Sequence, residues 1–223
     1  MQTLFEIITT KDKSHSLKSN IFNETYHSVN GAYSESKYIF IENGVEKLKN
    51  LSEINIFEVG FGTGLNALLS FEWAVNNKKT VNYTGIEKFP VNTETINKLN
   101  YNNLSDTAEN FFKKIHKAKW NEKVQLDKYF SFCKIEGDLL SFSTDKKFDL
   151  IFFDAFSPDT QNDMWSVDIF NKMYIILSNN GLLTTYSSKG TVKRNLRSAG
   201  FDVKRLPGPL GKRHMLNATK ITS

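Results

Sequence analysis

The feature that most constrains this chain is a glycine-rich turn placed directly between a strand-like run and a helical pattern. The turn reads Gly-Phe-Gly-Thr-Gly over residues 60–64, after INIFEV at 54–59 and before LNALLSFEWAV at 65–75. Glycines allow a sharp turn and close backbone approach to a ligand, and the following helix offers free N–H groups at its N-terminus. The pattern predicts a nucleotide-type cofactor loop.

The spacing of the glycines bears on which cofactor the loop accepts. A dinucleotide fingerprint, G-x-G-x-x-G, needs a small residue at position 65, where this sequence has Leu65; the third glycine is instead Gly64. The loop has no Lys or Arg to neutralise a pyrophosphate, and Glu58 precedes it. An acidic loop suits a cofactor with a sulfonium and an amino group, so we expect S-adenosylmethionine around Gly60, Gly62 and Gly64.

After residue 54, short runs rich in β-branched and aromatic residues alternate with helical patterns. Strands are expected at 54–59, 81–87, 132–138, 148–154, 181–187, 201–206 and 213–219, and helices near 65–75, 91–100, 108–120, 166–177 and 190–199. Such alternation predicts a parallel sheet with right-handed crossovers. PGPLGK, between the last two strands, is too short for a crossover helix, so these strands are expected to form an antiparallel hairpin.

A mostly parallel seven-stranded sheet with an antiparallel C-terminal strand resembles the α/β, Rossmann-like fold of class I S-adenosylmethionine-dependent methyltransferases. Residues 1–50 have a different pattern, with Asn-Gly pairs at 30–31 and 43–44 that mark tight turns. We therefore expect a β-rich extension over 1–50, leading through a first helix at 44–50 into a methyltransferase domain over 51–223.

Cysteine content and hydropathy exclude several classes of protein. Cys133 has no partner for an internal disulfide, and no Cys/His cluster has zinc-ligand spacing, so no metal is expected. No window reaches the roughly 18 apolar residues of a membrane span, and the N-terminus lacks the apolar run of a secretory leader. The expected location is the cytoplasm, with no membrane partner.

Acidic residues close three successive expected strands. Glu87 ends the second, where an acid accepts hydrogen bonds from ribose hydroxyls, and Asp138 ends the third, where it faces an adenine edge. Glu58 stands near the end of the first, and these three acids are followed by Asp154 at the end of the fourth. An acid at a strand end is also commonly a helix cap or a solvated side chain. Combined with the glycine loop, however, the three favour S-adenosylmethionine in the crevice at the carboxyl ends of the strands.

Asp154 opens the segment Asp-Ala-Phe-Ser-Pro, which is similar in layout to the D/N-P-P-Y/F motif of methyltransferases that act on exocyclic amines. There an acid or amide orients the nitrogen and an aromatic ring, here Phe156, stacks on the base. The alternative is that Asp154 caps the next turn and Phe156 is core. Trp165 and Tyr186 are candidates for an aromatic cage around the substrate, or equally for structural positions.

The positive charge of the chain is concentrated at its C-terminal end. Residues 185–223 hold nine of the 29 basic residues and one of the 24 acids, so this segment is net +8 and the remainder net −3. A solvated basic face explains this, as does a binding surface for a polyanion. The residues that would contact a nucleic-acid backbone are Lys189, Lys193, Arg194, Arg197, Lys204, Arg205, Lys212 and Arg213.

Four segments together resemble one family. They are YHSVNGAYSESKYIF (26–40), FEVGFGTGLN (57–66), FFDAFSPD with the following DMW (152–165), and SSKGTVKRNLRSAGFDV (187–203). They are similar to the tRNA 5-methylaminomethyl-2-thiouridine methyltransferases, the MnmD-like proteins, which correspond to the methyltransferase half of the bifunctional MnmC enzyme. The resemblance covers nearly the whole chain, and the glycine loop combined with Asp-Ala-Phe-Ser-Pro is its specific part.

The resemblance implies methyl transfer from S-adenosylmethionine to the primary amine of 5-aminomethyl-(2-thio)uridine at the tRNA wobble position, with Asp154 near that amine. It implies that the cofactor site is lined by Glu58, Gly60, Gly62, Asn66, Glu87 and Asp138. It also brings Tyr26, Ser28 and Asn30 close to the cofactor. With no second dinucleotide loop and no room for a flavin oxidase domain, the chain is expected to receive its amine from another enzyme.

Two other functions fit parts of the pattern. A small-molecule transferase of the same fold, such as a polyamine aminopropyltransferase, uses the same glycine loop but needs no basic segment. A non-catalytic RNA-binding module needs the basic segment but not Glu58, Gly60 or Asp154. A nicotinamide dehydrogenase is disfavoured by Leu65.

Overall fold

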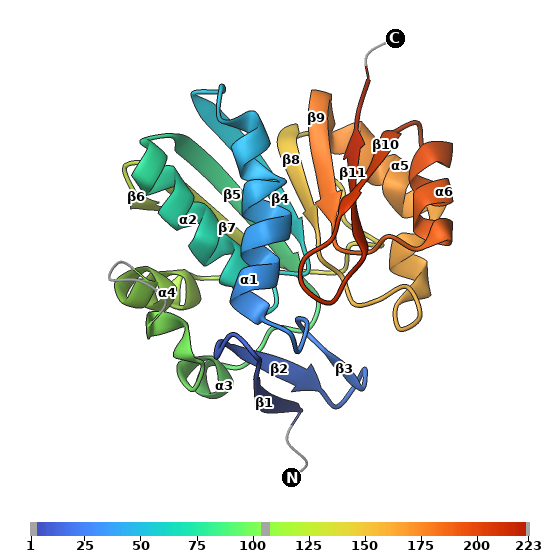
Figure 1. Cartoon of the computed structure of the whole chain (residues 1–223). Coiled ribbons are helices and arrows are strands. Elements are labelled where there is room, and N and C mark those ends of the chain that lie inside the picture. Colours follow the sequence, from blue (N-terminus) through green and yellow to red (C-terminus); the bar gives the residue numbers. More distant parts are fainter. Residues whose placement is uncertain (1–3, 104–107, 222–223) are drawn as a thin grey trace.

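An eight-stranded sheet runs through the middle of the computed structural model, which describes residues 4–103 and 108–221 (Figure 1). The spatial order of the strands is β10-β11-β9-β8-β4-β5-β7-β6. Their bounds are Glu53–Val59 (β4), Thr80–Glu87 (β5), Lys123–Asp127 (β6), Phe130–Glu136 (β7), Phe148–Phe153 (β8), Leu177–Thr185 (β9), Asp202–Pro207 (β10) and His214–Thr219 (β11). The five central strands β9, β8, β4, β5 and β7 pair in parallel, which confirms the predicted fold class.

The strand count corrects the prediction, because the described residues form eight strands in this sheet and not seven. The additional strand is β6, which pairs antiparallel with β7 at one edge. Its sequence, Lys-Val-Gln-Leu-Asp, is short and has no fully buried residue, so it lacks the apolar run that marks the central strands. At the other edge β11 is antiparallel to both β9 and β10, as the short PGPLGK connection predicts.

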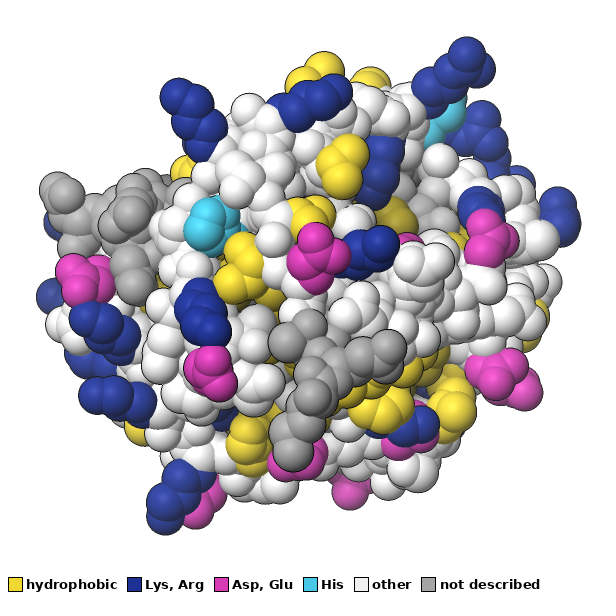
Figure 2. All heavy atoms as spheres, turned by 90° about the horizontal axis from the view of Figure 1, so that it is seen from below, with side chains coloured by type: hydrophobic (Ala, Val, Ile, Leu, Met, Phe, Trp, Pro, Cys, Tyr) yellow, Lys and Arg dark blue, Asp and Glu magenta, His cyan; other side chains and the backbone are white. Residues whose placement is uncertain are grey.

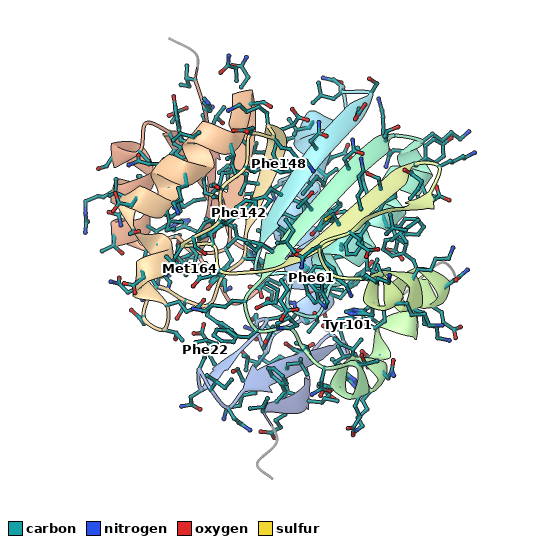
Figure 3. The ribbon with its side chains drawn as sticks, turned by 180° about the vertical axis from the view of Figure 1, so that it is seen from behind. Phe22, Phe61, Tyr101, Phe142, Phe148 and Met164 are labelled. Atoms are coloured by element: carbon teal, nitrogen blue, oxygen red, sulfur yellow. The ribbon has the colours of Figure 1, made fainter. Side chains whose placement is uncertain are left out.

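Helices cover both faces of the sheet (Figures 1 and 3). Helix α2 (Leu65–Asn77) packs on one face, and α5 (Val167–Ile176) and α6 (Gly190–Ser198) pack on the other. The side chains of β4 alternate accordingly: Ile56 lies in the core under α2, and Phe57 in the core under α5. Helix α4 (Ala108–Lys117) contacts β6 and the 3₁₀ turn η3 (Asn100–Asn103), and α3 (Thr93–Asn97) lies below α4 in Figure 1. None of the described helices has the length and apolar character needed to cross a bilayer.

The N-terminal segment begins with a separate three-stranded antiparallel sheet of β1 (Phe5–Thr9), β2 (His15–Ser19) and β3 (Glu24–Thr25). This small sheet lies below the central sheet in Figure 1. It is on the same side as the glycine loop, since Tyr26, directly after β3, lies against Gly62. The N-terminal sheet therefore covers the carboxyl ends of the parallel strands.

Residues 32–42 form a helix, which the strand-like run Tyr-Ile-Phe-Ile did not indicate. The segment comprises α1 (Ala32–Ser36) and a π-helical continuation, η1 (Lys37–Glu42), followed by the 3₁₀ turn η2 (Val45–Leu48). Its buried positions, among them Ala32, Ser36 and Phe40, recur every four residues, as on one helix face. The two Asn-Gly pairs are not hairpin turns, because Gly31 is the N-cap of α1 and Asn43 the C-cap of η1.

Candidate active site

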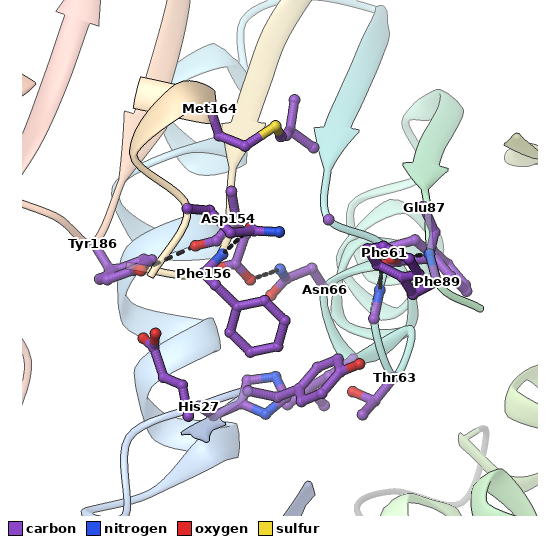
Figure 4. A pocket seen from close by; sticks show the side chains of 18 of the residues that line it. His27, Phe61, Thr63, Asn66, Glu87, Phe89, Asp154, Phe156, Met164 and Tyr186 are labelled. Atoms are coloured by element: carbon purple, nitrogen blue, oxygen red, sulfur yellow. Dashed lines mark hydrogen bonds between the residues drawn. The ribbon is translucent and has the colours of Figure 1, made fainter. Parts of the chain in front are cut away.

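A cavity of about 410 Å³ lies between the carboxyl ends of the central strands and the N-terminal sheet (Figure 4). Four strand ends contribute to its wall, through the glycine loop after β4, Glu87 of β5, Asp138 after β7 and Asp154 after β8. Parallel strands end at the same sheet edge, which is why residues far apart in sequence meet here. We call the part around Gly62, Glu87 and Asp138, where the sequence predicts the cofactor, the cofactor half. The part around Asp154, Phe156 and Tyr186, where it predicts the acceptor, is the acceptor half.

The glycine loop turns in a conformation that only glycine adopts readily. Gly60 has φ of +85° and Gly62 has φ of +51°. The segments after β4 and β8 also approach each other closely here. A Cβ at Gly60 would lie 2.6 Å from the backbone oxygen of Asp154, so only glycine fits at this position. Gly60 and Gly62 line the cavity, whereas Gly64 lies behind them as the N-cap of α2.

Glu87 binds the glycine loop itself. Its Oε2 accepts a hydrogen bond from the Gly62 N–H at 2.9 Å, and its Oε1 accepts one from the Phe89 N–H at 2.9 Å. Burial raises the pKa of this carboxyl. Each oxygen keeps a further lone pair for a ligand, so Glu87 both shapes the loop and faces the cavity.

Asp138 faces the same half of the cavity from the next strand along the sheet. Lys88 forms an ion pair with its Oδ2 at 2.8 Å, and the Leu140 N–H donates to its Oδ1 at 2.9 Å. The hydrogen bond from Lys88 holds the pKa of Asp138 below its usual value, so the group is ionised at neutral pH. Lys88 also lines the cavity, and this ion pair offsets its charge.

The amide of Asn66 connects two carboxyl groups. Its Nδ2 donates at 2.9 Å to Glu58 Oε1 and at 2.9 Å to Asp154 Oδ2. Glu58 is 1 % exposed and lies beneath the cavity wall, where desolvation raises its pKa well above the ordinary value. Glu58 is therefore a support for Asn66, and Asn66 itself lines the cavity.

Asp154 has an unusual protonation equilibrium. Burial raises its pKa from 3.8 to about 7, against the opposing effect of the hydrogen bond from Asn66. A carboxyl with a pKa near neutrality both accepts and releases protons at working pH, which is the property required of a general base. Figure 4 shows Asp154 between Asn66 and Tyr186, with the ring of Phe156 beneath it.

Aromatic rings form much of the acceptor half. Phe156 packs edge-on against Tyr26, with ring centroids 4.9 Å apart, and its other neighbour is Phe22 at 4.8 Å. Tyr186 lines the cavity, and its hydroxyl donates to the Ala155 backbone oxygen at 2.9 Å. Trp165 does not line the cavity. It is 2 % exposed, and its indole N–H donates to the Phe156 backbone oxygen at 2.8 Å, so it supports the loop from inside.

The N-terminal segment closes the cavity from the other side. Tyr26 and Ser28 line it, and Tyr26 lies over Gly62. Asn30 does not reach it: its side chain accepts a hydrogen bond from Lys11 Nζ at 2.8 Å and lies against Gly211.

Glu24 was not among the predicted site residues. It joins the N-terminal segment, which covers the cavity, to the loop after β8. It accepts hydrogen bonds from the Ser157 N–H at 3.1 Å and the Ser157 hydroxyl at 2.9 Å.

The predicted basic residues divide into two groups. Lys212 lines the cavity, whereas the other seven lie outside it: Lys189, Lys193, Arg194, Arg197, Lys204, Arg205 and Arg213. Lys189 forms an ion pair with Asp159, and Arg194 and Arg197 are exposed on α6. Figure 2, viewed from the side of the N-terminal sheet, shows Lys and Arg side chains around the rim of this face, with a group at the upper right.

Two further residues of the N-terminal segment escaped the sequence analysis. His27 lines the cavity and shares a hydrogen bond with Ser16 Oγ at 2.9 Å; desolvation lowers its pKa to about 4, so it is neutral at pH 7. Glu35, on α1, lines the cavity as well. Both lie in the segment 26–40 that carries part of the family resemblance, but their side chains were assigned no role there, and only the fold shows that they line the cavity. Within the described residues, no group of three His, Cys, Asp or Glu side chains is arranged to hold a metal ion.

Comparison with known proteins gives consistent results. Residues 95–221 match a family model described as S-adenosyl-L-methionine-dependent methyltransferase. The chain is 29% identical over 204 residues to the tRNA 5-methylaminomethyl-2-thiouridine biosynthesis bifunctional protein MnmC of Campylobacter hominis, covering 88% of this chain and 30% of that protein. The protein of the same name from Pseudomonas fluorescens is 28% identical, with 86% and 31% covered.

A solved structure is also similar. The crystal structure of MNMC2 from Aquifex aeolicus superimposes with a TM-score of 0.80 at 25% identity, covering 100% of this chain and 71% of that one. The chain spans about a third of the length of the curated relatives that it matches.

Proposed function

The chain belongs to a family of S-adenosyl-L-methionine-dependent methyltransferases, and we propose that it methylates the primary amine of 5-aminomethyl-(2-thio)uridine at the wobble position of tRNA. The curated relatives are named for the biosynthesis of 5-methylaminomethyl-2-thiouridine in tRNA, and this chain corresponds to about a third of their length. The proposal therefore concerns the methyl-transfer step alone.

The lining of the cofactor half supports S-adenosylmethionine as its ligand. Gly60 and Gly62 place no side chain between the cavity and their own backbone, and Glu87 and Asp138 supply carboxylates on the adjoining wall. Gly62, Glu87 and Asp138 would hold the nucleoside part of the cofactor, with Tyr26 covering it. When bound, the cofactor supplies a methyl group on a cationic sulfonium, which a neutral amine can accept.

The observation that carries the proposal is the position and pKa of Asp154. Its carboxyl lies in the cavity wall with one oxygen held by Asn66, and its pKa is about 7. An aliphatic amine is mostly protonated at neutral pH and cannot act as a nucleophile in that form. Asp154 would accept the ammonium proton, or a hydrogen bond from the nitrogen, and so direct the lone pair of the amine into the cofactor half.

The rings around Asp154 suit a nucleobase. Phe156 and Tyr186 would flank a uracil that has left the anticodon stack, as enzymes acting on a base require. The cavity of about 410 Å³ is in the range expected for a small-molecule site, so an extruded nucleotide rather than a whole stem would enter it.

Helix α6 would bind the tRNA backbone beside the cavity. Two contacts join it to the loop that carries Phe156: Lys189 pairs with Asp159, and Asn195 Nδ2 donates to the Trp165 backbone oxygen at 2.8 Å. The exposed cations of α6 therefore continue from the rim of the acceptor half. Contacts of this kind position an RNA without reading its sequence.

The direct test is nucleoside analysis of tRNA incubated with the protein and methyl-labelled S-adenosylmethionine. tRNA that carries 5-aminomethyl-2-thiouridine should gain one labelled methyl at the wobble nucleoside, and tRNA without that modification should gain none. A diamine offered in place of tRNA tests the small-molecule alternative, once with the methyl-labelled cofactor for methyl transfer and once with decarboxylated cofactor labelled in its aminopropyl group for aminopropyl transfer. Label on the diamine alone would refute the tRNA proposal.

The RNA surface has a separate test. Reversal of Lys189, Lys193 and Arg197 to Glu should weaken tRNA binding at least about tenfold and flatten its salt dependence. Reversal of Lys113, Lys114 and Lys117 on α4 makes the same change in net charge and should have a much smaller effect. Equal effects of the two variants would assign the binding to net charge rather than to α6.

A further inference from the structure

An ion pair in the cavity wall joins two segments that lie far apart in sequence. Lys212, in the connection between β10 and β11, lies with its Nζ 2.5 Å from Glu35 Oε1 on α1. The Glu35 side chain is 9% exposed, and its other oxygen accepts a hydrogen bond from the Ser28 N–H at 2.7 Å. Both charged side chains line the same cavity as Asp154.

The ammonium of Lys212 is held in a defined position. It lies over the ring of Tyr186, 4.1 Å from the ring centroid, and the Tyr186 hydroxyl is bonded to the backbone of Ala155, the residue after Asp154. An ammonium over an aromatic face is stabilised by the ring quadrupole. Tyr186 and Glu35 therefore fix Lys212 from two sides, at the acceptor half.

We propose that Glu35 and Lys212 are a positioning pair that sets the charge of the acceptor half, with Lys212 favouring the neutral form of the acceptor amine. This inference rests on the proposed function, because it concerns an amine substrate. Lys212 repels a second positive charge nearby, so it favours loss of the ammonium proton. In that step an N–H bond of the substrate breaks, an O–H bond forms at Asp154, and the nitrogen keeps the electron pair.

The side chains around Asp154 are mostly acidic, and the positive charge of Lys212 offsets part of their negative charge. The titratable side chains that surround it come from every element packed on the site: Glu58 of β4, Tyr83 and Glu87 of β5, Tyr186 after β9, Glu24, His27 and Glu35 of the N-terminal segment, and Lys212. Acids dominate this set, and His27 is neutral. Of the two lysines among the described lining residues, Lys88 is paired with Asp138 in the cofactor half.

The two members of the pair act on Asp154 in opposite directions. The negative charge of Glu35 raises the pKa of Asp154, and the positive charge of Lys212 lowers it; both effects are smaller than that of burial. Removing either charge alone should therefore shift the proton equilibrium of the site, and the two shifts should have opposite signs. A pair with a purely structural role would destabilise the fold in both variants without this reversal.

The experiment compares Glu35→Gln, Lys212→Met and the double variant. The pKa of the Asp154 carboxyl is measured by NMR titration of the carboxyl carbon in the cofactor-free protein. We expect a lower pKa in Glu35→Gln, a higher one in Lys212→Met, and an intermediate value in the double variant. With modified tRNA, the acid limb of kcat/KM should move in the same directions, so that the two single variants differ about threefold or more at pH 6.5.

Matched controls and a second readout separate the possible failures. Arg213→Met, at the exposed neighbour of Lys212, and Glu42→Gln, at an exposed acid after α1, should leave the Asp154 titration unchanged. Shifts of the same sign in both single variants, or no shifts, would overturn the inference whatever the activity. If the titrations reverse as expected but the wild-type protein does not methylate the modified tRNA, the proposed function fails and the charge coupling stands.

Discussion

The two halves of the cavity are built in different ways. The cofactor half comes from short segments that follow β4, β5 and β7, and each contributes its residues at the same edge of one sheet. The acceptor half combines the end of β8 with Tyr186, the N-terminal segment and the connection between β10 and β11. The first half depends on local chain geometry, and the second on tertiary packing.

This difference separates the effects expected of substitutions. Residues of the cofactor half hold the backbone of one loop, as Glu87 does through the N–H groups of Gly62 and Phe89. Residues of the acceptor half hold charges and separate segments together, as Glu35 does through Lys212. Changes in the first half should act on cofactor binding, and changes in the second on turnover and on acceptor binding.

The largest effect is expected from Asp154→Ala. Loss of the carboxyl that receives the proton should lower kcat with modified tRNA by about 10²- to 10⁴-fold, the usual contribution of a general base. Cofactor affinity, measured by calorimetry, should change little, because Asp154 belongs to the acceptor half. Asp159→Asn removes an exposed acid five residues away and should keep near wild-type kcat. Turnover close to wild type in Asp154→Ala would remove Asp154 from the mechanism.

Gly60→Ala should show the reverse pattern. The added Cβ meets the Asp154 backbone oxygen at 2.6 Å in a backbone conformation with φ of +85°, so the loop must move. We expect cofactor affinity to fall about 50-fold in the same calorimetric assay. Gly190→Ala, at the start of α6, is the control. A Cβ there would lie 3.4 Å from Arg194 Nη1, which is an ordinary van der Waals contact, so the backbone need not move. Unchanged affinity in Gly60→Ala would show that the loop tolerates displacement.

Weakening the attachment of the N-terminal segment over the cavity should have a smaller effect on activity. Glu24→Gln weakens the hydrogen bonds to Ser157 that tie β3 to the loop after β8, and a hydrogen bond to a charged group contributes about 1.5–3 kcal/mol. The remaining contacts limit the result to a KM increase of about three- to tenfold for cofactor and tRNA, with kcat nearly unchanged. Glu6→Gln, at an exposed position of β1, should leave both KM values as they are. A fall in kcat alone would argue against a covering role.

The smallest effect expected is a gain in stability at alkaline pH from Asp154→Asn. The pKa of Asp154 is raised in the folded state, so its contribution to stability is present in full below pH 3.8 and is lost as the pH rises through about 7. Asn removes this dependence. At pH 8 the variant should be more stable by about 1–2 kcal/mol, or roughly 2–8 °C in Tm. The carboxyl is partly exposed to the cavity, and this exposure reduces the cost of ionising it in the folded protein.

The pH series provides the control for that measurement. The difference in Tm between Asp154→Asn and the wild-type protein should shrink towards zero as the pH falls to about 3, because the carboxyl is then mostly protonated in both the folded and the unfolded state. A constant difference across this range would show that packing, and not ionisation, separates the two proteins.

Much of the cofactor half could be predicted from sequence because its signals are local. The glycines of the loop, Glu87 and Asp138 stand at the ends of recognisable strands, and parallel strands bring such residues together. β6 was missed because it is short and half-buried, and the helix at 32–42 because isoleucine and phenylalanine are typical of strands as well as of buried helix faces.

The acceptor half could be predicted only in part, since side-chain direction and long-range contacts decide it. Asp154, Phe156 and Tyr186 line the cavity, whereas Trp165, from the same stretch of sequence, faces the core. The ion pair of Glu35 could not be predicted from the segment around it, because its partner is a lysine 177 positions away.

The sequence by itself indicated the family through the resemblance of four segments. It also indicated the parallel sheet and the strand ends beside the glycine loop, because periodicity and glycine spacing are properties of neighbouring residues. The tertiary structure decided which charges meet. It turned Trp165 and Asn30 away from the cavity, left the cations of α6 outside it, and brought Lys212 inside to Glu35. A charge acts through distance and burial, and folding sets both.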